Sequence, residues 1–202
     1  ASAPLEADVL NYMIYIYTNH TGNASSLTHQ YGVQAKKIVE QSRKTIADLL
    51  GIDQMEVIFT GGATESDNMA VRGLERYARE SGKNHFITSS IEHKAVLESM
   101  KDLQKKGFLV DFIDPDESGR VSADAVLAHV TDKTALVSVM HVNSETGIIQ
   151  PVQEIGDYLK DKDVFFHIDA TQSFGKRNAE LRATAYDMLS VSAHKIRGPQ
   201  GV

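Results

Sequence analysis

Five short runs of the sequence combine residue types that can do chemistry, and each follows an apolar stretch of strand length. They begin at Thr60, Ser89, His141, His167 and Ser190 and read TGGATESDN, SSIEH, HVNSETG, HIDATQ and SVSAHK. A single His, Asp or Lys at a strand end is usually structural. Their recurrence at several strand ends predicts one shared site, because ligands of open parallel sheets bind beyond the carboxyl ends of the strands.

The run that begins at Thr60 has the composition of a phosphate-binding turn. Gly61 and Gly62 allow a tight turn and close backbone approach, and Thr64 is predicted to cap the helix that follows, with Asp67 completing a capping box. The free N–H groups and the positive dipole end of such a helix favour a phosphate. A well-capped helix without a ligand is the alternative, since neither the P-loop spacing nor G-x-G-x-x-G is present.

A metal site and a serine hydrolase are the main competing interpretations. The chain has eight histidines, and His167 and Asp169 lie two apart on a strand, which is compatible with metal ligation. The sequence has no H-x-x-x-H helix pair and no cysteine to complete a metal site, and no G-x-S-x-G nucleophile elbow. We therefore predict that no metal is bound.

Composition excludes further classes of function. The 202 residues contain no cysteine, which excludes disulfides, Cys-ligated zinc, iron–sulfur clusters and a thiol nucleophile within them. With 21 Lys+Arg against 27 Asp+Glu, the net charge of −6 disfavours nucleic-acid binding. No stretch approaches the roughly 18 apolar residues of a membrane span, and the first residues do not read as a signal peptide. We expect a soluble, cytoplasmic protein that associates with neither nucleic acid nor membrane.

The elements that must position the polar runs alternate between strands and helices. Apolar runs predict strands at 57–60, 85–90, 109–113, 135–141, 164–168 and 188–192. Helical spacing or helix-start signals predict helices at 65–80, 93–106, 122–130 and 151–160, the last two opened by Ser122 and Pro151. Nearly continuous apolar strands between amphipathic helices predict an α/β fold with a mostly parallel sheet covered on both faces.

The first fifty residues differ from the rest. Residues 5–17 and 33–50 are predicted to be helical, the second helix ending at Gly51, with a polar loop at 19–32 between them. This divides the chain into N-terminal helices at 1–51 and an α/β core at 52–202. The sequence stops in a turn signal at Gly198–Val202, where a natural domain seldom ends, so we expect the chain to be truncated there.

Taken together, the runs TGGATES, SIEH, VNSETG, HIDATQ and SAHK resemble the NifS/IscS-type cysteine desulfurases, pyridoxal-phosphate enzymes of the class V aminotransferase group. They occur in the family's order and span nearly the whole chain. The resemblance implies the large domain of the aspartate-aminotransferase-like fold type I of PLP-dependent transferases. That domain is incomplete here, because the family's inserted antiparallel seventh strand would start near Val202 and its small domain would follow.

The resemblance also implies roles for particular residues. Lys195 would bond covalently to the cofactor aldehyde, Asp169 would pair with the pyridine nitrogen, and His93 would lie over the ring and move protons. The phosphate would be held by Thr64, backbone groups near Ala63, Ser192 and His194. The phenolic oxygen would contact Gln172 and Asn143.

The implied reaction converts L-cysteine, or a related amino acid, to L-alanine and leaves the sulfur as a persulfide on an enzyme cysteine. In the family that cysteine, and the arginine that binds the substrate carboxylate, lie downstream of the lysine, and neither is in this chain. The implied partners are a second copy of the chain and a sulfur acceptor such as an iron–sulfur scaffold protein. Ser144 and Gln200 depart from the family pattern. Open alternatives are a non-catalytic or degenerate subunit of the same fold, or a relative that acts on selenocysteine or cysteine sulfinate or as a plain class V aminotransferase.

Overall fold

A computed structural model describes residues 3–202 and divides them into two compact units. The sheet unit comprises Thr60–Ser192 and Gly201–Val202. The N-terminal unit comprises the described residues up to Phe59 together with Ala193–Gln200. The boundary thus lies after Phe59, and the segment that carries His194 and Lys195 groups with the N-terminal helices.

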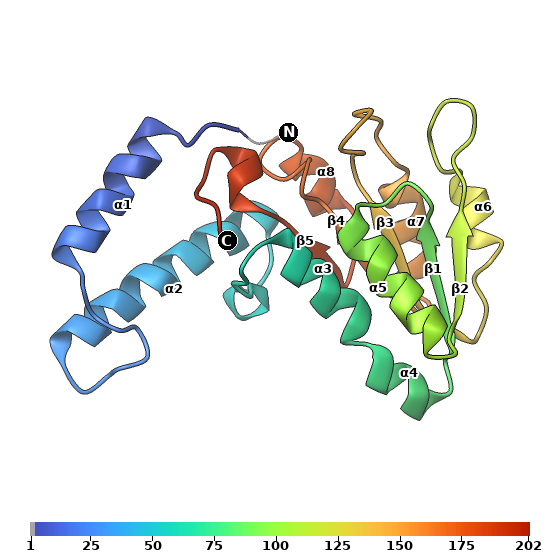
Figure 1. Cartoon of the computed structure of the whole chain (residues 1–202), viewed down its shortest axis with the longest axis horizontal. Coiled ribbons are helices and arrows are strands. Elements are labelled where there is room, and N and C mark those ends of the chain that lie inside the picture. Colours follow the sequence, from blue (N-terminus) through green and yellow to red (C-terminus); the bar gives the residue numbers. More distant parts are fainter. Residues whose placement is uncertain (1–2) are drawn as a thin grey trace. The chain divides into compact units, whose positions relative to one another are not determined.

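The sheet unit is built on five parallel strands in the order β2-β1-β3-β4-β5 (Figure 1). Their bounds are β1 His85–Ser89, β2 Leu109–Ile113, β3 Thr134–Met140, β4 Phe165–Asp169 and β5 Met188–Ser190. These confirm five of the predicted strands to within about two residues. The strand order reverses direction at β1, because β2 lies on one side of it and β3 on the other. Such a switch point opens a crevice at the carboxyl ends of the strands.

Helices cover both faces of this sheet, as right-handed parallel crossovers require (Figure 1). On one face lie α3 (Ala63–Arg72), α4 (Glu75–Ser81) and α5 (Lys94–Lys105), and on the other lie α6 (Ala123–Leu127) and α7 (Val152–Leu159). The sixth helix of the unit, α8, spans Asn178–Ala183. Gly156 of α7 is needed for close packing, because a β-carbon there would lie 2.4 Å from the carbonyl oxygen of Ala185.

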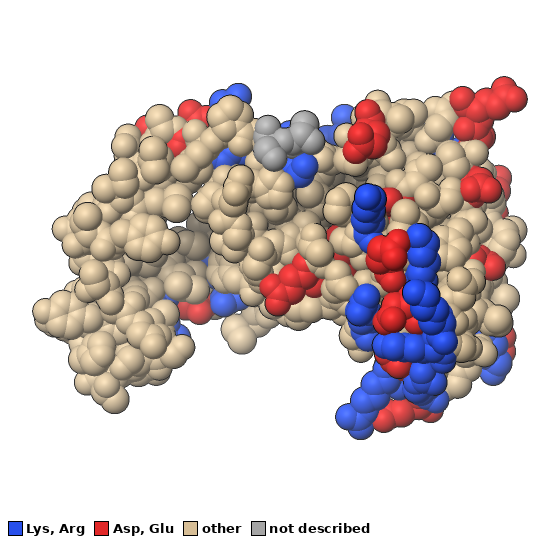
Figure 2. Space-filling view, in the orientation of Figure 1, with Lys and Arg blue, Asp and Glu red and all other residues tan. Residues whose placement is uncertain are grey.

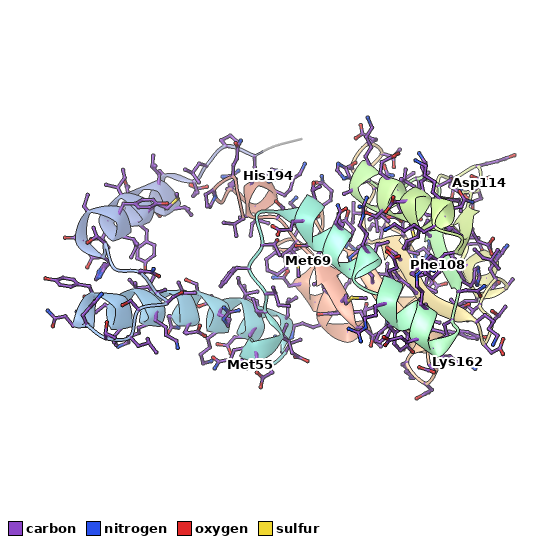
Figure 3. All side chains as sticks on the ribbon, turned by 60° about the horizontal axis from the view of Figure 1, so that its bottom comes forward. Met55, Met69, Phe108, Asp114, Lys162 and His194 are labelled. Atoms are coloured by element: carbon purple, nitrogen blue, oxygen red, sulfur yellow. The ribbon has the colours of Figure 1, made fainter. Side chains whose placement is uncertain are left out.

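One cluster of the hydrophobic core lies between the sheet and the layer formed by α3, α4 and α5. Every residue of β1 and β3 is buried, as expected for central strands covered on both sides. Phe86 of β1 packs edge-on against Phe108, with ring centroids 5.3 Å apart, among Val96, Met100 and Leu103 of α5 (Phe108 is marked in Figure 3). This cluster fixes α5 on the sheet and thereby the loop between β1 and α5.

Two predicted elements of this region are wrong in part. Residues 57–60 are extended but have no strand partner among the described residues, so they are not a β-strand. A strand exists only when its backbone is paired with that of a neighbouring strand. The helix predicted at 65–80 is divided into α3 and α4 at Gly73 and Leu74.

The N-terminal unit contains α1 (Ala7–Asn19), α2 (Gln30–Leu50) and two 3₁₀ turns, η1 (Gln54–Glu56) and η2 (Ala193–Ile196). As predicted, α2 ends at Gly51, which adopts the left-handed conformation with φ of 74°. The guanidinium of Arg43 donates to the carbonyl of Val57 and lies over the ring of Phe59. The Arg197 guanidinium pairs with the Glu6 carboxylate at 2.8 Å.

Lys and Arg side chains gather over α4 and α5, interleaved with Asp and Glu (Figure 2). Most of them form ion pairs across one helical turn or between the two helices, such as Arg76–Glu80 at 2.7 Å and Lys106–Glu75 at 2.8 Å. The paired carboxylates compensate much of the positive charge of this ridge. No helix in the described residues combines the length and apolar character needed to cross a membrane.

Candidate functional site

The loops that follow β1 and β3 are joined by hydrogen bonds at the carboxyl edge of the sheet. Oε1 of Glu92 accepts from the Ser89 hydroxyl at 2.6 Å and from the Met140 backbone N–H at 2.8 Å. The side-chain amide of Asn143 donates to the carbonyl of Ile91 at 3.2 Å. The polar runs predicted to end β1 and β3 are therefore brought together at this edge.

Asp169 ends β4 at the same edge. Its backbone is in register with Met140 of β3 and Ser190 of β5, and it is buried except for 6% of its surface. One carboxylate oxygen accepts the N–H of Thr171 at 2.9 Å, and the other has no intramolecular donor among the described residues. A buried carboxylate with one open oxygen can accept a hydrogen bond from a cationic ring nitrogen.

The N-terminus of α3 points toward the same edge. α3 runs antiparallel to the strands (Figure 1), and its residue Asp67 lies beside His167 of β4, with Oδ1 and Nε2 3.6 Å apart. Within the described residues, the backbone N–H groups of Ala63 and Thr64 have no intramolecular acceptor. Gly62 has φ of 133°, and a β-carbon there would meet no atom within 4 Å, so the space beside this N-cap residue is open. This arrangement suits a phosphate.

The predicted capping box of α3 is wrong. The helix begins at Ala63 with Gly62 as its N-cap, so Thr64 lies inside the first turn and its side chain does not cap. The backbone N–H of Gly61 is instead accepted by the Glu65 carboxylate at 2.5 Å. Asp67 is buried against the sheet, because it shares a helix face with Ala70 and Val71, which lie three and four positions further along the helix.

Two other predicted residues, His93 and Asn143, are positioned by local hydrogen bonds, and a third, Gln172, is not. His93 is the N-cap of α5, where its Nδ1 accepts the N–H of Ala95 at 3.2 Å. Asn143 organises its own loop, since its Oδ1 accepts from the N–H groups of Glu145 and Thr146. The half-buried Gln172 has no side-chain hydrogen bond to the described residues.

Ser192, His194 and Lys195 follow β5 along the chain. Ser192 is buried, and its hydroxyl donates to the backbone oxygen of Val202 at 3.3 Å. His194 and Lys195 lie in η2 of the N-terminal unit, where the carbonyl of His194 accepts the N–H of Ala3 at 3.3 Å. Both side chains are half-buried.

Sequence reasoning missed a buried polar group behind Asp169. His167 is completely buried, and its Nδ1 and Nε2 lie 2.8 Å and 2.9 Å from the hydroxyls of Ser138 and Ser190. Burial lowers the pKa of His167 to about 4. Burial, reinforced by the charge of Asp169, raises the pKa of Asp67 to about 8, and burial raises that of Glu92 to about 8. The helical spacing of Asp67 with Ala70 and Val71 is the sequence signal that places Asp67 on a buried face.

These pKa values predict that folding becomes less favourable as the pH rises from 6.5 to 8. Asp67 and Glu92 keep their protons in the folded chain up to about pH 8, whereas in the unfolded chain they lose them near 3.8 and 4.5. The folded state therefore binds more protons in this window, so the free energy of unfolding decreases. His167 acts in the opposite direction only below 6.5, its unperturbed pKa. We expect a decrease of about 2–4 kcal/mol, since each group contributes up to about 1.4 kcal/mol per pH unit.

Urea denaturation of the chain at several pH values measures this decrease. The variants Asp67→Asn and Glu92→Gln should each remove about half of it, and the exposed variant Asp161→Asn should leave it unchanged. The same pH dependence in the double variant would contradict the assignment to these two groups.

The carboxyl edge thus offers N–H groups that could bind an anion and a carboxylate oxygen that could accept a hydrogen bond from a cationic group. Residues 1–202 match the family model described as aminotransferase class-V. The chain belongs to the class-V aminotransferase family. Within the described residues, no group of three His, Asp or Glu side chains is placed to hold a metal ion.

Relatives within this family are cysteine desulfurases. The chain is 44% identical to cysteine desulfurase IscS of Anaeromyxobacter dehalogenans and 41% identical to a probable mitochondrial cysteine desulfurase of Dictyostelium discoideum, and it covers 50% and 45% of their lengths. Among solved structures, DndA of Streptomyces lividans superimposes on the whole chain with a TM-score of 0.91 at 44% identity, and 56% of DndA is covered. The chain thus spans about half the length of the curated relatives it matches.

Proposed function

We propose that this chain is the pyridoxal-phosphate-binding part of a cysteine desulfurase, which converts L-cysteine to L-alanine and passes the sulfur to a cysteine thiol. The observation that carries the proposal is the pairing of two features at one sheet edge. Asp169 has an open carboxylate oxygen there, and α3 directs the unpaired N–H groups of Ala63 and Thr64 to the same edge. These features suit the ring nitrogen and the phosphate of the cofactor.

The remaining cofactor contacts are assigned by the family motifs. Thr64, Ser192 and His194 are proposed to hold the phosphate together with the backbone at Ala63. Gln172 is proposed to contact the phenolic oxygen through its unengaged amide, and Asn143 to support this contact while it organises its loop. Lys195 is proposed to bond to the cofactor aldehyde. When bound, pyridoxal phosphate supplies an electron sink for bonds at the substrate α-carbon.

His93 is proposed to move a proton at its Nε2 atom. Because its Nδ1 accepts the N–H of Ala95, the neutral ring carries its proton on Nε2. The cap also fixes the ring at the start of α5, and the side chain is exposed. A proton donor held in one orientation is what a proton-transfer step requires.

The thiol that receives the sulfur is proposed to lie outside these residues, since the 202 residues contain no cysteine. The resemblance to the family is the reason to propose that the arginine for the substrate carboxylate also lies outside them. One solved relative, SspA, is described in complex with cysteine and is 40% identical to the chain. L-cysteine is therefore the proposed substrate, and an iron–sulfur scaffold protein is a proposed recipient of the sulfur.

A homodimer is the proposed assembly, supported by the apolar surface of α1. None of the residues of α1 is buried, although the helix carries several large apolar side chains that are about half exposed or more, at Leu10, Tyr12, Ile14, Tyr15 and Tyr17. Apolar surface of this extent usually marks an interaction site. A cytoplasmic location stays a prediction, since relatives include bacterial and mitochondrial proteins.

Trapping of the cofactor tests the proposed function. The purified chain is mixed with pyridoxal phosphate, reduced with borohydride and mapped by mass spectrometry. We expect a visible absorption band before reduction and a single major modified peptide containing Lys195. Lys195→Ala should abolish both, and the matched control Lys176→Ala, an exposed lysine after β4, should change neither. Labelling spread over surface lysines, without a band that depends on Lys195, would overturn the proposal.

A further inference from the structure

Three carboxyl groups, those of Asp67, Glu92 and Asp169, lie buried behind the carboxyl edge of the sheet, and we call them the buried acid cluster. Asp67 is 1% exposed, Glu92 5% and Asp169 6%. They come from α3, from the loop after β1 and from the end of β4. The register of the sheet brings them together. Glu92 accepts the N–H of Met140, and Met140 is paired with Asp169 on the neighbouring strand. Asp67 lies beside His167, which precedes Asp169 by two residues and is therefore on the same face of the strand.

No cation of the sheet unit neutralises this cluster. No lysine or arginine of that unit forms an ion pair with any of the three carboxyl groups. His167 is the only basic group of the unit that faces Asp67, and its Nε2 lies 3.6 Å from Oδ1, beyond hydrogen-bond distance. Both ring nitrogens of His167 are instead within hydrogen-bond distance of serine hydroxyls, at Ser138 and Ser190. The imidazole is therefore satisfied as a neutral ring.

The hydrogen bonding of Asp67 and Glu92 also fits the neutral form of their carboxyl groups. Among the residues that the structure describes, neither oxygen of Asp67 has a partner in hydrogen-bond geometry, although the nearby Ser190 hydroxyl opposes the rise in its pKa, and Oε2 of Glu92 likewise has no partner. An ionised carboxylate without donors is very costly to bury, whereas a protonated one loses much less. Several like charges in one buried cluster also raise each other's free energy. Asp169 differs, because it accepts the N–H of Thr171 and has an oxygen open to the edge.

We propose that Asp67 and Glu92 are neutral acids and His167 a neutral imidazole in the folded chain near neutral pH, so that Asp169 is the only ionised carboxyl group of the buried acid cluster. Asp67 and Glu92 are thus positioning residues. They fill the space behind Asp169 without adding a second negative charge that would favour protonation of Asp169. A protonated Asp169 would be a poorer hydrogen-bond partner for a cationic ring nitrogen. This consequence rests on the proposed function, whereas the charge states of Asp67, Glu92 and His167 do not.

Infrared spectroscopy of the cofactor-free chain tests the charge states directly. Protonated carboxyl groups give a carbonyl stretch separate from the carboxylate bands. Near neutral pH we expect two such bands, one lost in Asp67→Asn and the other in Glu92→Gln, and both lost as the pH is raised well above 8. The exposed controls Asp161→Asn and Glu117→Gln should retain both bands. Absence of protonated-carboxyl bands from the wild-type chain would overturn the proposal, whether or not the variants fold.

Nitrogen NMR of His167 supplies a second, independent readout. We expect the pattern of a neutral ring with one protonated nitrogen, unchanged in Asp67→Asn. An imidazolium pattern that is lost in Asp67→Asn would show instead an Asp67–His167 ion pair and refute the proposal. Both measurements use the chain without pyridoxal phosphate, so their failure is distinguishable from failure of the proposed function. With pyridoxal phosphate, the exposed control Asp161→Asn should bind with the wild-type affinity and Asp169→Asn should not.

Discussion

Replacing Asp169 by asparagine should weaken the binding of pyridoxal phosphate by about 10- to 100-fold, corresponding to about 1.5–3 kcal/mol for a hydrogen bond to a charged group. Asparagine can keep the bond from the N–H of Thr171, which one oxygen of Asp169 accepts at 2.9 Å. Its amide nitrogen would then occupy the position of the open oxygen. An amide nitrogen donates hydrogen bonds and does not accept them, so two donors would face each other at the ring N–H. The negative charge that favours a protonated ring would also be lost.

Titration of the chain with pyridoxal phosphate, followed by absorbance or fluorescence, measures this loss. Asp161→Asn makes the same chemical change at an exposed position and should bind as the wild-type chain does. The unfolding free energy of Asp169→Asn is a further control, because a large decrease would indicate a structural effect. Equal affinity of Asp169→Asn and wild type would show that Asp169 does not contact the cofactor ring.

Glu92→Ala should destabilise the fold by about 2–5 kcal/mol. The Glu92 carboxyl group is the acceptor for the Ser89 hydroxyl and for the N–H of Met140. Alanine leaves both buried donors unsatisfied, at about 1–3 kcal/mol each, and creates a cavity between the loops after β1 and β3. Glu92→Gln should retain most of the stability near neutral pH, because its carbonyl oxygen can accept both hydrogen bonds and its amide replaces a neutral acid.

Urea denaturation of the two variants separates these effects. Glu117→Ala removes an exposed glutamate from the turn after β2 and should change the free energy of unfolding by less than about 0.5 kcal/mol. If Glu92→Ala were as stable as wild type, the bonds to Ser89 and Met140 would not link the loops. If Glu92→Gln were as unstable as Glu92→Ala near neutral pH, the result would indicate that the Glu92 side chain is ionised in the folded wild-type chain.

Much of the sheet could be predicted from the sequence because its central strands are buried on both faces. Continuous apolar runs are the signature of such strands, and the fully buried β1 at residues 85–89 lies within the predicted range of 85–90. Residues 57–60 have the same apolar character yet form no strand. Apolar character reports burial and propensity, whereas a strand also requires a neighbour with which to pair.

Part of the candidate site could likewise be predicted, because the change from apolar to polar residues marks the end of a strand in the sequence. Asp169 lies at the end of β4, where the polar run after the apolar stretch placed it. The position of Asp67 three residues after Thr64 predicts a capping box, but the helix begins at Ala63 and Asp67 lies on its buried face with Ala70 and Val71. The capping interpretation uses only residues near the helix start, whereas the buried position of Asp67 follows from the apolar residues three and four positions after it.

The α/β class, the family resemblance, the lack of a thiol in these residues and the prediction of a site at the carboxyl edge all came from the amino-acid sequence. They follow from local periodicity, from residue types at strand ends and from composition. That Asp67, Glu92 and His167 lie together behind Asp169 is visible in the folded chain alone. Their protonation depends on burial and on neighbours brought from three separate segments of the chain, and no local sequence pattern carries that information.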